Sequence, residues 1–284
     1  MQQISIISSS KDPAGINIRN RLIGLFDFEK ATEKFDGNEV FSFKTGDKII
    51  KLYLTNEDLI SAENIDKKII ADSYIFASKH RSKENTPSFA VHPIGNWNKA
   101  DFGGKEKTLC PSSAILLKDL FISLAQNSHF SQKNANFEVT MEATHHGPYV
   151  EKPAVFVEIG STEKEYNDAS NGEIIAKTIM DALKTKNKNY NGCIVLGGGH
   201  YNQSANKLML QTSYAVGHIC PKYALEYLDE DMLLQAINKI IPKPQMIILD
   251  WKGLGQYKSK TIELLEKLKL KYGRSQNIMA EVNN

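Results

Sequence analysis

Histidines and glutamates gather around residue 145 of the sequence. Residues 137–143 alternate apolar and polar side chains, which predicts a strand with one apolar and one polar face. Glu142 lies near the end of this strand, and His145 and His146 then begin a Gly-Pro turn that ends it. Imidazole and carboxylate groups bind zinc and transfer protons, so this turn is a candidate site. The plainer alternative is a polar turn beside a solvated glutamate.

A second strand end brings another carboxylate to the same region. Residues 154–159 are almost entirely apolar, which predicts a strand buried on both faces, and Glu158 lies near its end. Thr162 and Glu165 have the spacing of a capping box, so we expect a helix to start there. Ligands bind at the carboxyl ends of strands in open α/β sheets. Two adjacent strand ends with two histidines and two glutamates therefore predict a functional site.

A third strand end combines glycines with a histidine. Residues 193–196 predict a short buried strand that leads into Gly197, Gly198 and Gly199, followed by His200. The bare backbone of these glycines lets a ligand approach their N–H groups closely. The pattern GGGH is weak by itself and gains weight from its place at a strand end.

Two further predicted strands end in residues that can contact a ligand. The segment 214–220 contains His218 and is followed by Lys222, and the segment 246–249 is followed by Trp251. A lone histidine in an apolar strand is more often a hydrogen-bonded core residue. His218 is therefore expected to be structural.

Between about residues 79 and 110 the sequence lacks a clear strand or helix period. Loops this long inside a compact domain are usually functional, and this one carries His80, Arg81 and His92. Because it follows a predicted strand end, we interpret it as a basic loop insertion that faces the substrate. An ordinary exposed basic loop is the alternative.

The rest of the chain alternates short apolar strands with amphipathic helices. Further strands are predicted at residues 4–7, 49–54 and 69–77. Helices are predicted at about residues 18–25, from Pro111 to about 124, from Thr162 to about Lys184 with an interruption near Asn171-Gly172, at 229–241 and at 259–272. This order favours an α/β fold with a mostly parallel central sheet flanked by helices, forming one catalytic domain over residues 1–284.

The composition is that of an ordinary soluble globular protein. The 284 residues are 41% hydrophobic and 24% charged, and no apolar run reaches the roughly 20 residues that span a bilayer. Cys110, Cys193 and Cys220 lack metal-binding spacing and suit a reducing compartment. A net charge of +2 permits a nucleic-acid partner, but a DNA-coating domain is usually more basic. We therefore expect a cytoplasmic protein without a membrane or DNA partner.

Six motifs occur in one order along the chain: SSSKDPAGINI, SKHRSKENTPSFAVHPIGNW, EATHHGP, FVEIGSTEKEY, GGGHY and GHICPKYAL. Together they resemble the archaeal and plant type of D-aminoacyl-tRNA deacylase, from about Ser8 to Lys252. The resemblance implies a phosphorylase/hydrolase-like core similar to peptidyl-tRNA hydrolase. It implies hydrolysis of the ester between a D-amino acid and the 3′-terminal adenosine of tRNA, and a zinc requirement of two ions per subunit. Asn202 and Gln203 depart from the expected pattern, which has Ala-Pro there.

An aminoacyl ester is already activated, so such an enzyme mainly has to place a water molecule and stabilise the oxyanion. The candidates for catalysis are His145, His146, Glu142 and Glu158. The candidate zinc ligands are His145, His146, His200 and Glu142. The candidate substrate contacts are Gly198, Gly199, His80, Arg81, His92, Lys222 and Trp251. A metal-free mechanism, in which a histidine–glutamate pair orients water, stays open.

The expected partner is the 3′-terminal adenosine end of D-aminoacyl-tRNA. Contacts to its phosphates are expected from Lys11, Lys79, Arg81, Lys83 and Lys105. Two other functions stay open: a small-molecule phosphorylase or nucleosidase that holds phosphate at the segment SSSKD, and a non-catalytic RNA-binding protein. The sequence is compatible with a monomer or a homodimer.

Overall fold

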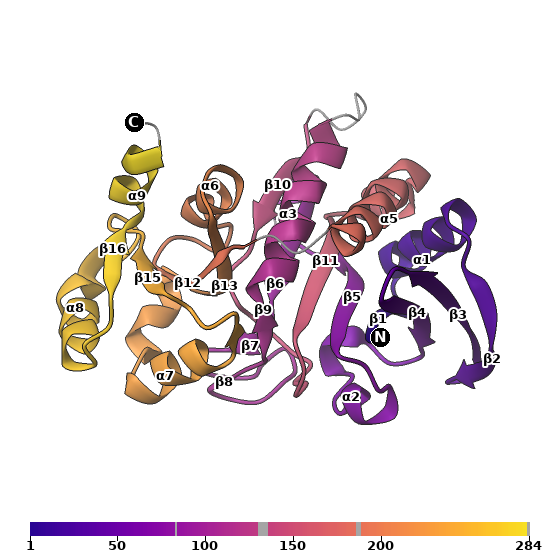
Figure 1. The fold of residues 1–284 in the computed structure, drawn as a ribbon, viewed down its shortest axis with the longest axis horizontal. Coiled ribbons are helices and arrows are strands. Elements are labelled where there is room, and N and C mark those ends of the chain that lie inside the picture. Colours follow the sequence, from indigo (N-terminus) through magenta and orange to yellow (C-terminus); the bar gives the residue numbers. More distant parts are fainter. Residues whose placement is uncertain (83, 130–135, 186–188, 283–284) are drawn as a thin grey trace.

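The strands form two sheets that lie side by side (Figure 1). The computed structural model describes residues 1–82, 84–129, 136–185 and 189–282, and within them the larger sheet has eight strands and the smaller has four. In spatial order the larger sheet consists of β10 (Glu138–Met141), β6 (Ser88–Pro93), β11 (Ala154–Gly160), β5 (Ser73–His80), β1 (Gln2–Ser9), β4 (Lys48–Thr55), β3 (Asn38–Thr45) and β2 (Glu29–Phe35). The smaller sheet consists of β13 (Tyr214–Cys220), β12 (Asn191–Leu196), β15 (Met246–Leu249) and β16 (Tyr272–Arg274).

Most neighbouring strands run parallel. In the larger sheet β1 pairs in parallel with β4 and β5, β11 with β5, and β10 with β6. All three strand pairs of the smaller sheet, as described, are parallel. The antiparallel pairs of these sheets are β2 with β3, β3 with β4, and β11 with β6. The predicted α/β class with a mostly parallel sheet and flanking helices is confirmed.

The strands belong to two sheets rather than to the single central sheet that the sequence predicted. Each parallel pair needs a crossover connection, and the chain after β12 supplies one after each strand. These connections pair β12, β13, β15 and β16 with one another and not with the larger sheet. The connecting helices are α6 (Gln203–Gln211), α7 (Glu230–Asn238) and α8 (Lys258–Lys267), and the final helix is α9 (Ser275–Val282).

Three helices cover one face of the larger sheet and close the main hydrophobic core (Figure 1). They are α1 (Pro13–Leu25), α3 (Ala114–His129) and α5 (Ala169–Lys184). Ile18, Leu120 and Ile175 of these helices are fully buried against strand residues such as Val157. Truncation of a buried leucine such as Leu120 to alanine should cost about 2–5 kcal/mol of stability. Because α3 also packs on β13, the same helix ties the smaller sheet to the larger one.

Short elements complete the fold. Two pairs of two-residue strands are β7 (Gly95–Asn96) with β8 (Thr108–Leu109), and β9 (Ser112–Ser113) with β14 (Ile240–Ile241). The short helical elements are η1 (Leu59–Ser61), α2 (Ile65–Lys68), α4 (Glu163–Asn167), η3 (Lys222–Tyr227) and η4 (Gly255–Tyr257). Among the described residues, no helix combines the length and the apolar character that crossing a membrane requires.

The region between residues 79 and 110 is not the continuous irregular loop that the sequence predicted. Ser88–Pro93 forms β6, which is buried along its whole length and pairs with β10 and β11. The prolines and glycines around this segment hide its strand pattern, because they are typical of loops. The sequence predicted that the ends of β10 and β11 are adjacent. This prediction is wrong, because β6 lies between the two strands.

Three predicted boundaries also differ from the structure. The helix predicted from Pro111 begins at Ala114, because Ser112–Ser113 pairs as β9. The predicted strand 69–77 is shifted to Ser73–His80, since Ile69 ends α2. The capping box of Thr162 and Glu165 is present, but the helix breaks at Asp168 and not near residues 171–172. Asp168 accepts a hydrogen bond from Ser170 N and so starts a new helix.

Candidate active site

The segment Glu142–His146 runs along the seam between the two sheets. Its first three N–H groups donate in turn to the carbonyl oxygens of Val91 at 3.1 Å, His200 at 2.8 Å and Ile219 at 3.1 Å. Val91 belongs to the larger sheet, whereas Ile219 lies in β13 and His200 follows β12 of the smaller one. The turn that bears the histidines is therefore held by both sheets.

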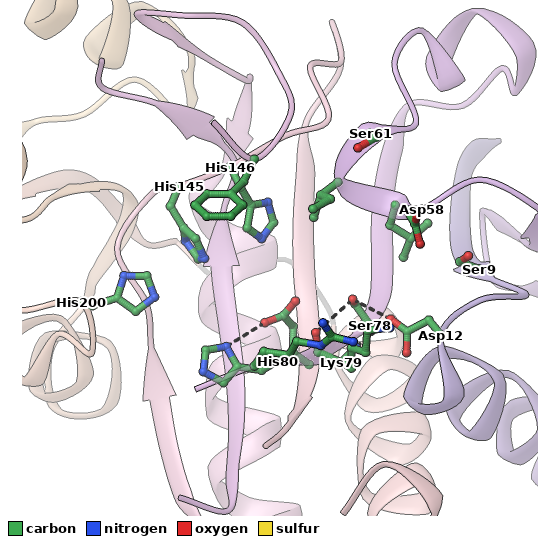
Figure 2. A pocket seen from close by; sticks show the side chains of 15 residues that line it. Ser9, Asp12, Asp58, Ser61, Ser78, Lys79, His80, His145, His146 and His200 are labelled. Atoms are coloured by element: carbon green, nitrogen blue, oxygen red, sulfur yellow. Dashed lines mark hydrogen bonds and ion pairs between the residues drawn. The ribbon is translucent and has the colours of Figure 1, made fainter. Parts of the chain in front are cut away.

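Five histidines and two glutamates converge at this seam, and Figure 2 labels four of the histidines, His80, His145, His146 and His200. They come from the ends of β5, β6, β10, β11 and β12, and they are His80, His92, Glu142, His145, His146, Glu158 and His200. Their ligand atoms form three overlapping groups, in each of which the atoms lie within 4.8 Å of one another. These groups are His92–His145–His146, Glu142–His145–His200 and His80–Glu142–Glu158.

Backbone carbonyls fix the protonation of three of these rings. Nδ1 of His92 and of His146 lies 3.1 and 2.6 Å from the carbonyl oxygen of the following residue, and Nδ1 of His145 lies 2.7 Å from that of Ala143. A carbonyl oxygen only accepts, so each Nδ1 carries the proton and donates. When these rings are neutral, each Nε2 keeps a free lone pair, which is the arrangement found in metal-binding histidines.

His145 and His146 are held neutral by their surroundings. Burial, and then the nearby charge of His92, place the pKa of His145 well below its usual value. Burial and His92 likewise lower the pKa of His146 to about 3. The backbone of His146 has φ +44°, in the left-handed region, so the turn breaks the strand as predicted and the two rings lie 4.3 Å apart, centre to centre. Both rings therefore offer neutral imidazoles to one site.

Glu142 is a buried carboxylate without hydrogen-bond partners. Its side chain is 0% exposed, and neither oxygen makes a hydrogen bond within the described part of the chain. The nearest nitrogens are His80 Nδ1 at 3.1 Å, outside hydrogen-bond geometry, His200 Nε2 at 3.7 Å and His145 Nε2 at 3.8 Å. Burying a carboxylate whose oxygens make no hydrogen bond is costly. Together with the unpartnered Nε2 of His92, this donor set fits a bound cation.

His80 carries a positive charge between two carboxylates. Its Nδ1 lies 3.1 Å from Glu142 Oε1 and 3.3 Å from Glu158 Oε2. Burial opposes protonation of His80, but the contact with Glu158 and the charge of Glu142 outweigh it and raise the pKa of His80 to about 9. Burial also opposes ionisation of Glu158, yet His80 and His92 hold the pKa of Glu158 well below its usual value. Glu158 is therefore ionised at neutral pH.

A cavity of about 700 Å³ opens onto the cluster (Figure 2). His145, His146 and His200 lie on one side of it and Asp12 on the other, and His80 and Glu158 also line it. Asp12 caps α1 by accepting from Gly15 N at 3.0 Å, and its second oxygen accepts from Ser78 Oγ and Lys79 N, each at 2.9 Å. Burial raises the pKa of Asp12, although these hydrogen bonds partly offset it.

A second cavity, also of about 700 Å³, lies at the carboxyl edge of the smaller sheet. Gly198, Gly199 and Lys222 line it, so these predicted substrate contacts lie outside the first cavity. Trp251 lines neither cavity; its ring stacks under the Arg274 guanidinium, with Cζ 3.8 Å from the ring centre.

The structure brings together all four predicted catalytic residues and all four predicted zinc ligands. It adds His92 and His80 to the cluster, which the sequence assigned only to substrate contacts. His92 is 0% exposed and its ring stacks on Phe156, so it has no free surface for a substrate. Tyr201 was missed; its hydroxyl lies 2.7 Å from His80 Nε2, and its place directly after His200 was the available signal.

The predicted phosphate contacts are distributed unevenly. Lys79 and Arg81 line the first cavity. Lys11 lies 3.8 Å from Asp58 in an exposed ion pair, and Lys105 Nζ lies 3.9 Å from the centre of the Tyr149 ring. Lys83 lies outside the described residues. His218 is a core residue as predicted: it contacts Thr144 Oγ1 at 3.2 Å and donates from Nε2 to Cys110 O at 3.1 Å.

Comparison with known proteins identifies the family. The family model described as D-aminoacyl-tRNA deacylase matches residues 67–273. The D-aminoacyl-tRNA deacylase of Pyrococcus furiosus is 35% identical over 275 residues, which cover 94% of this chain and 98% of that protein. That of Methanocaldococcus jannaschii is 36% identical over 271 residues, which cover 92% and 95%. A crystal structure described as a conserved protein of unknown function has a TM-score of 0.87 and 32% identity, covering 98% of this chain and 97% of the other. The chain thus belongs to the D-aminoacyl-tRNA deacylase family.

Proposed function

We propose that this protein hydrolyses the ester bond of D-aminoacyl-tRNA and releases the free D-amino acid and the tRNA. Family membership supports this reaction. The observation that carries it is the Glu142 carboxylate, buried without a hydrogen-bond partner in the described chain among histidines, beside a cavity large enough for an aminoacylated ribose. A buried carboxylate that lacks hydrogen bonds is tolerated where it serves a bound cation or a reaction.

We propose zinc as the bound cation, held by His145, His146, His200 and Glu142, with His92 as a further ligand. The lone pairs at Nε2 of the neutral His145 and His146 support this assignment, as do the donor types. Glu142 and His145 each belong to two of the three donor groups. With each of these two residues assigned to one ion, the donors are enough for two ions. When bound, zinc supplies a Lewis acid for the ester carbonyl and for the attacking water.

The remaining residues position protons and substrate. His80, protonated at Nδ1, lies between Glu142 and Glu158 and keeps Glu158 ionised. A carboxylate with a depressed pKa is a weak base, so Glu158 is better suited to orient water than to take its proton. Burial also lowers the pKa of His145 and of His146, so both imidazoles are weak bases and suit metal binding better than proton transfer.

Cations at the rim of the first cavity suit the negative charge of the tRNA end. Lys79 and Arg81 line the cavity on either side of His80, Lys79 within β5 and Arg81 directly after it. Lysine and arginine bind phosphates without reading the base sequence. We assign these two residues to the phosphate of the terminal adenosine.

The experiment compares hydrolysis of D-tyrosyl-tRNA with that of L-tyrosyl-tRNA, each with a strong chelator and after zinc is added back. We expect selective hydrolysis of the D-ester, its loss with the chelator and its return with zinc. Selective hydrolysis that is indifferent to the chelator would retain the deacylase and remove the role of zinc. The absence of any selective hydrolysis would refute the proposed function.

A further inference from the structure

The second cavity lies directly beside the histidine–glutamate cluster. The segment Gly198–Tyr201 separates the two cavities, because His200 lines the first and Gly199 lines the second. We propose that the second cavity is a nucleotide subsite, which holds the penultimate nucleotide of the tRNA 3′ end while the ester of the terminal adenosine lies in the first. This inference rests on the proposed function.

Two aromatic rings in the second cavity suit an unpaired base. Tyr223 is 57% exposed, and its hydroxyl lies 3.1 Å from His200 Nδ1, so the ring stands at the border with the cluster. Tyr257 of η4 is half-buried and lines the same cavity. Every base presents an aromatic face, and stacking on tyrosine is the usual way in which proteins hold single-stranded nucleotides. The 3′ end of tRNA is single-stranded.

The polar groups of the cavity match the remainder of a cytidine nucleotide. Lys252 is exposed and has no ion-pair partner among the described residues, and Lys222 lines the same space. Gly199 N has no hydrogen-bond acceptor there either, and a Cβ added at Gly199 would meet only Tyr201 O, at 3.6 Å. These groups can receive a phosphate from two sides.

One carboxylate lies among these cations. Asp250 Oδ1 accepts from Gly253 N at 2.9 Å, whereas Oδ2 accepts from no donor in the described chain. A carboxylate oxygen is the group that accepts from the N4 amine of cytosine. The penultimate nucleotide of a CCA terminus is a cytidine. Its base amine suits the carboxylate of Asp250, and its phosphate suits the two lysines.

The position of the cavity also fits a continuous chain. Because the segment Gly198–Tyr201 lies between the two cavities, a strand whose terminal ester reaches the cluster can continue into the second cavity. Beyond it, on the loop after β15, Trp251 lies under Arg274 and within 5.1 Å of Lys258 Nζ. Positive charge and an aromatic face are therefore also present on the segment next to Lys252.

The test measures kcat/KM for three D-tyrosyl esters: of adenosine, of the dinucleotide CpA and of whole tRNA. For the wild type we expect the CpA ester to exceed the adenosine ester by about 10-fold or more. Lys252→Ala and Tyr257→Ala should each remove most of this gain and leave hydrolysis of the adenosine ester unchanged, which also shows that each variant is folded. Tyr257→Phe keeps the stacking ring and should keep the gain.

Lys271→Ala serves as the charge-matched control. Lys271 is exposed and precedes β16, at the opposite edge of the same sheet. Its removal should leave all three esters unaffected. Equal hydrolysis of the adenosine and CpA esters by the wild type, or a gain that survives both alanine variants, would overturn the subsite. Hydrolysis of the tRNA ester alone would overturn it too. If the second cavity binds the cytidine, the CpA ester has to be hydrolysed as well. Failure with all three D-esters would instead contradict the proposed function.

Discussion

The hydroxyl of Tyr201 lies 2.7 Å from Nε2 of His80, although 121 positions separate the two residues. His80 ends β5 in the larger sheet, and Tyr201 follows β12 in the smaller sheet. Because the pKa of His80 is raised to about 9, its Nε2 carries a proton at neutral pH and donates to the tyrosine oxygen. This contact is a side-chain link between the sheets at the catalytic seam.

Tyr201→Phe should therefore weaken the joint between the sheets. Loss of a largely buried bond to a charged donor should lower the free energy of unfolding by about 1–2 kcal/mol. Urea unfolding measures this change. Tyr223→Phe is the matched control, since its hydroxyl contacts the half-exposed His200 and its loss should cost less than about 0.5 kcal/mol. Equal losses in the two variants would contradict the link.

Glu142→Gln should remove the response of the protein to zinc. A ligand that binds only the folded state stabilises it by about 2.7 kcal/mol at a hundredfold excess over Kd, and loss of a ligating carboxylate should abolish most of this gain. Thermal unfolding with and without zinc, and equilibrium dialysis with elemental analysis, measure the effect. Glu138→Gln, on the same strand but half-exposed, is the control and should respond to zinc as the wild type does. An unchanged zinc content in Glu142→Gln would exclude Glu142 as a ligand.

His218 should make the protein less stable as the pH falls. Burial lowers the pKa of His218 from 6.5 to about 3, so the unfolded chain takes up a proton before the folded chain does. Its contribution to stability is complete above about pH 6.5 and is lost as the pH falls toward 3, by at most about 1.4 kcal/mol per pH unit.

Urea unfolding of the wild type and of His218→Gln at several pH values between 7 and 4 tests this linkage. The variant is expected to start less stable, because it loses the bonds to Thr144 and Cys110, and to depend less steeply on pH. Lys271→Gln, which alters an exposed residue, should keep the slope of the wild type. Parallel slopes for the wild type and His218→Gln would contradict the shifted pKa.

Reversing the charges of Lys79 and Arg81 should weaken binding of tRNA without changing the chemical step. The double variant Lys79→Glu/Arg81→Glu is expected to raise KM for D-aminoacyl-tRNA and to flatten its dependence on salt, because fewer counterions are released. Steady-state kinetics at several salt concentrations give both quantities. Lys271→Glu changes an exposed lysine away from both cavities and should change neither. An unaltered salt dependence in the double variant would remove Lys79 and Arg81 from the phosphate contacts.

The sequence was sufficient to predict the centre of the site. Glu142, His145, His146 and His200 each follow a strand pattern, but the strands belong to different sheets, so these residues meet at the seam between the sheets and not at one edge of a parallel sheet. The break that lets His145 and His146 face one site was predictable too, because glycine and proline follow them.

The parts that could not be predicted depend on contacts between distant segments. His92 lies in a strand that is flanked by loop-forming residues, so its local pattern favours a loop although tertiary pairing makes it β6. The link from His80 to Tyr201 exists only because two sheets meet, and nothing local in either segment specifies that meeting.

The backbone hydrogen bonds of the seam also determine when the site can form during synthesis of the chain. Ala143 and Thr144 leave the ribosome long before His200 and Ile219, whose carbonyl oxygens they need. Until β12 and β13 have been synthesised, the turn with His145 and His146 is therefore bound to the larger sheet only. A nascent chain stalled before Ile219 contains the histidines and glutamates of the cluster but lacks the β13 backbone that positions them. Activity can therefore report when synthesis has passed that point.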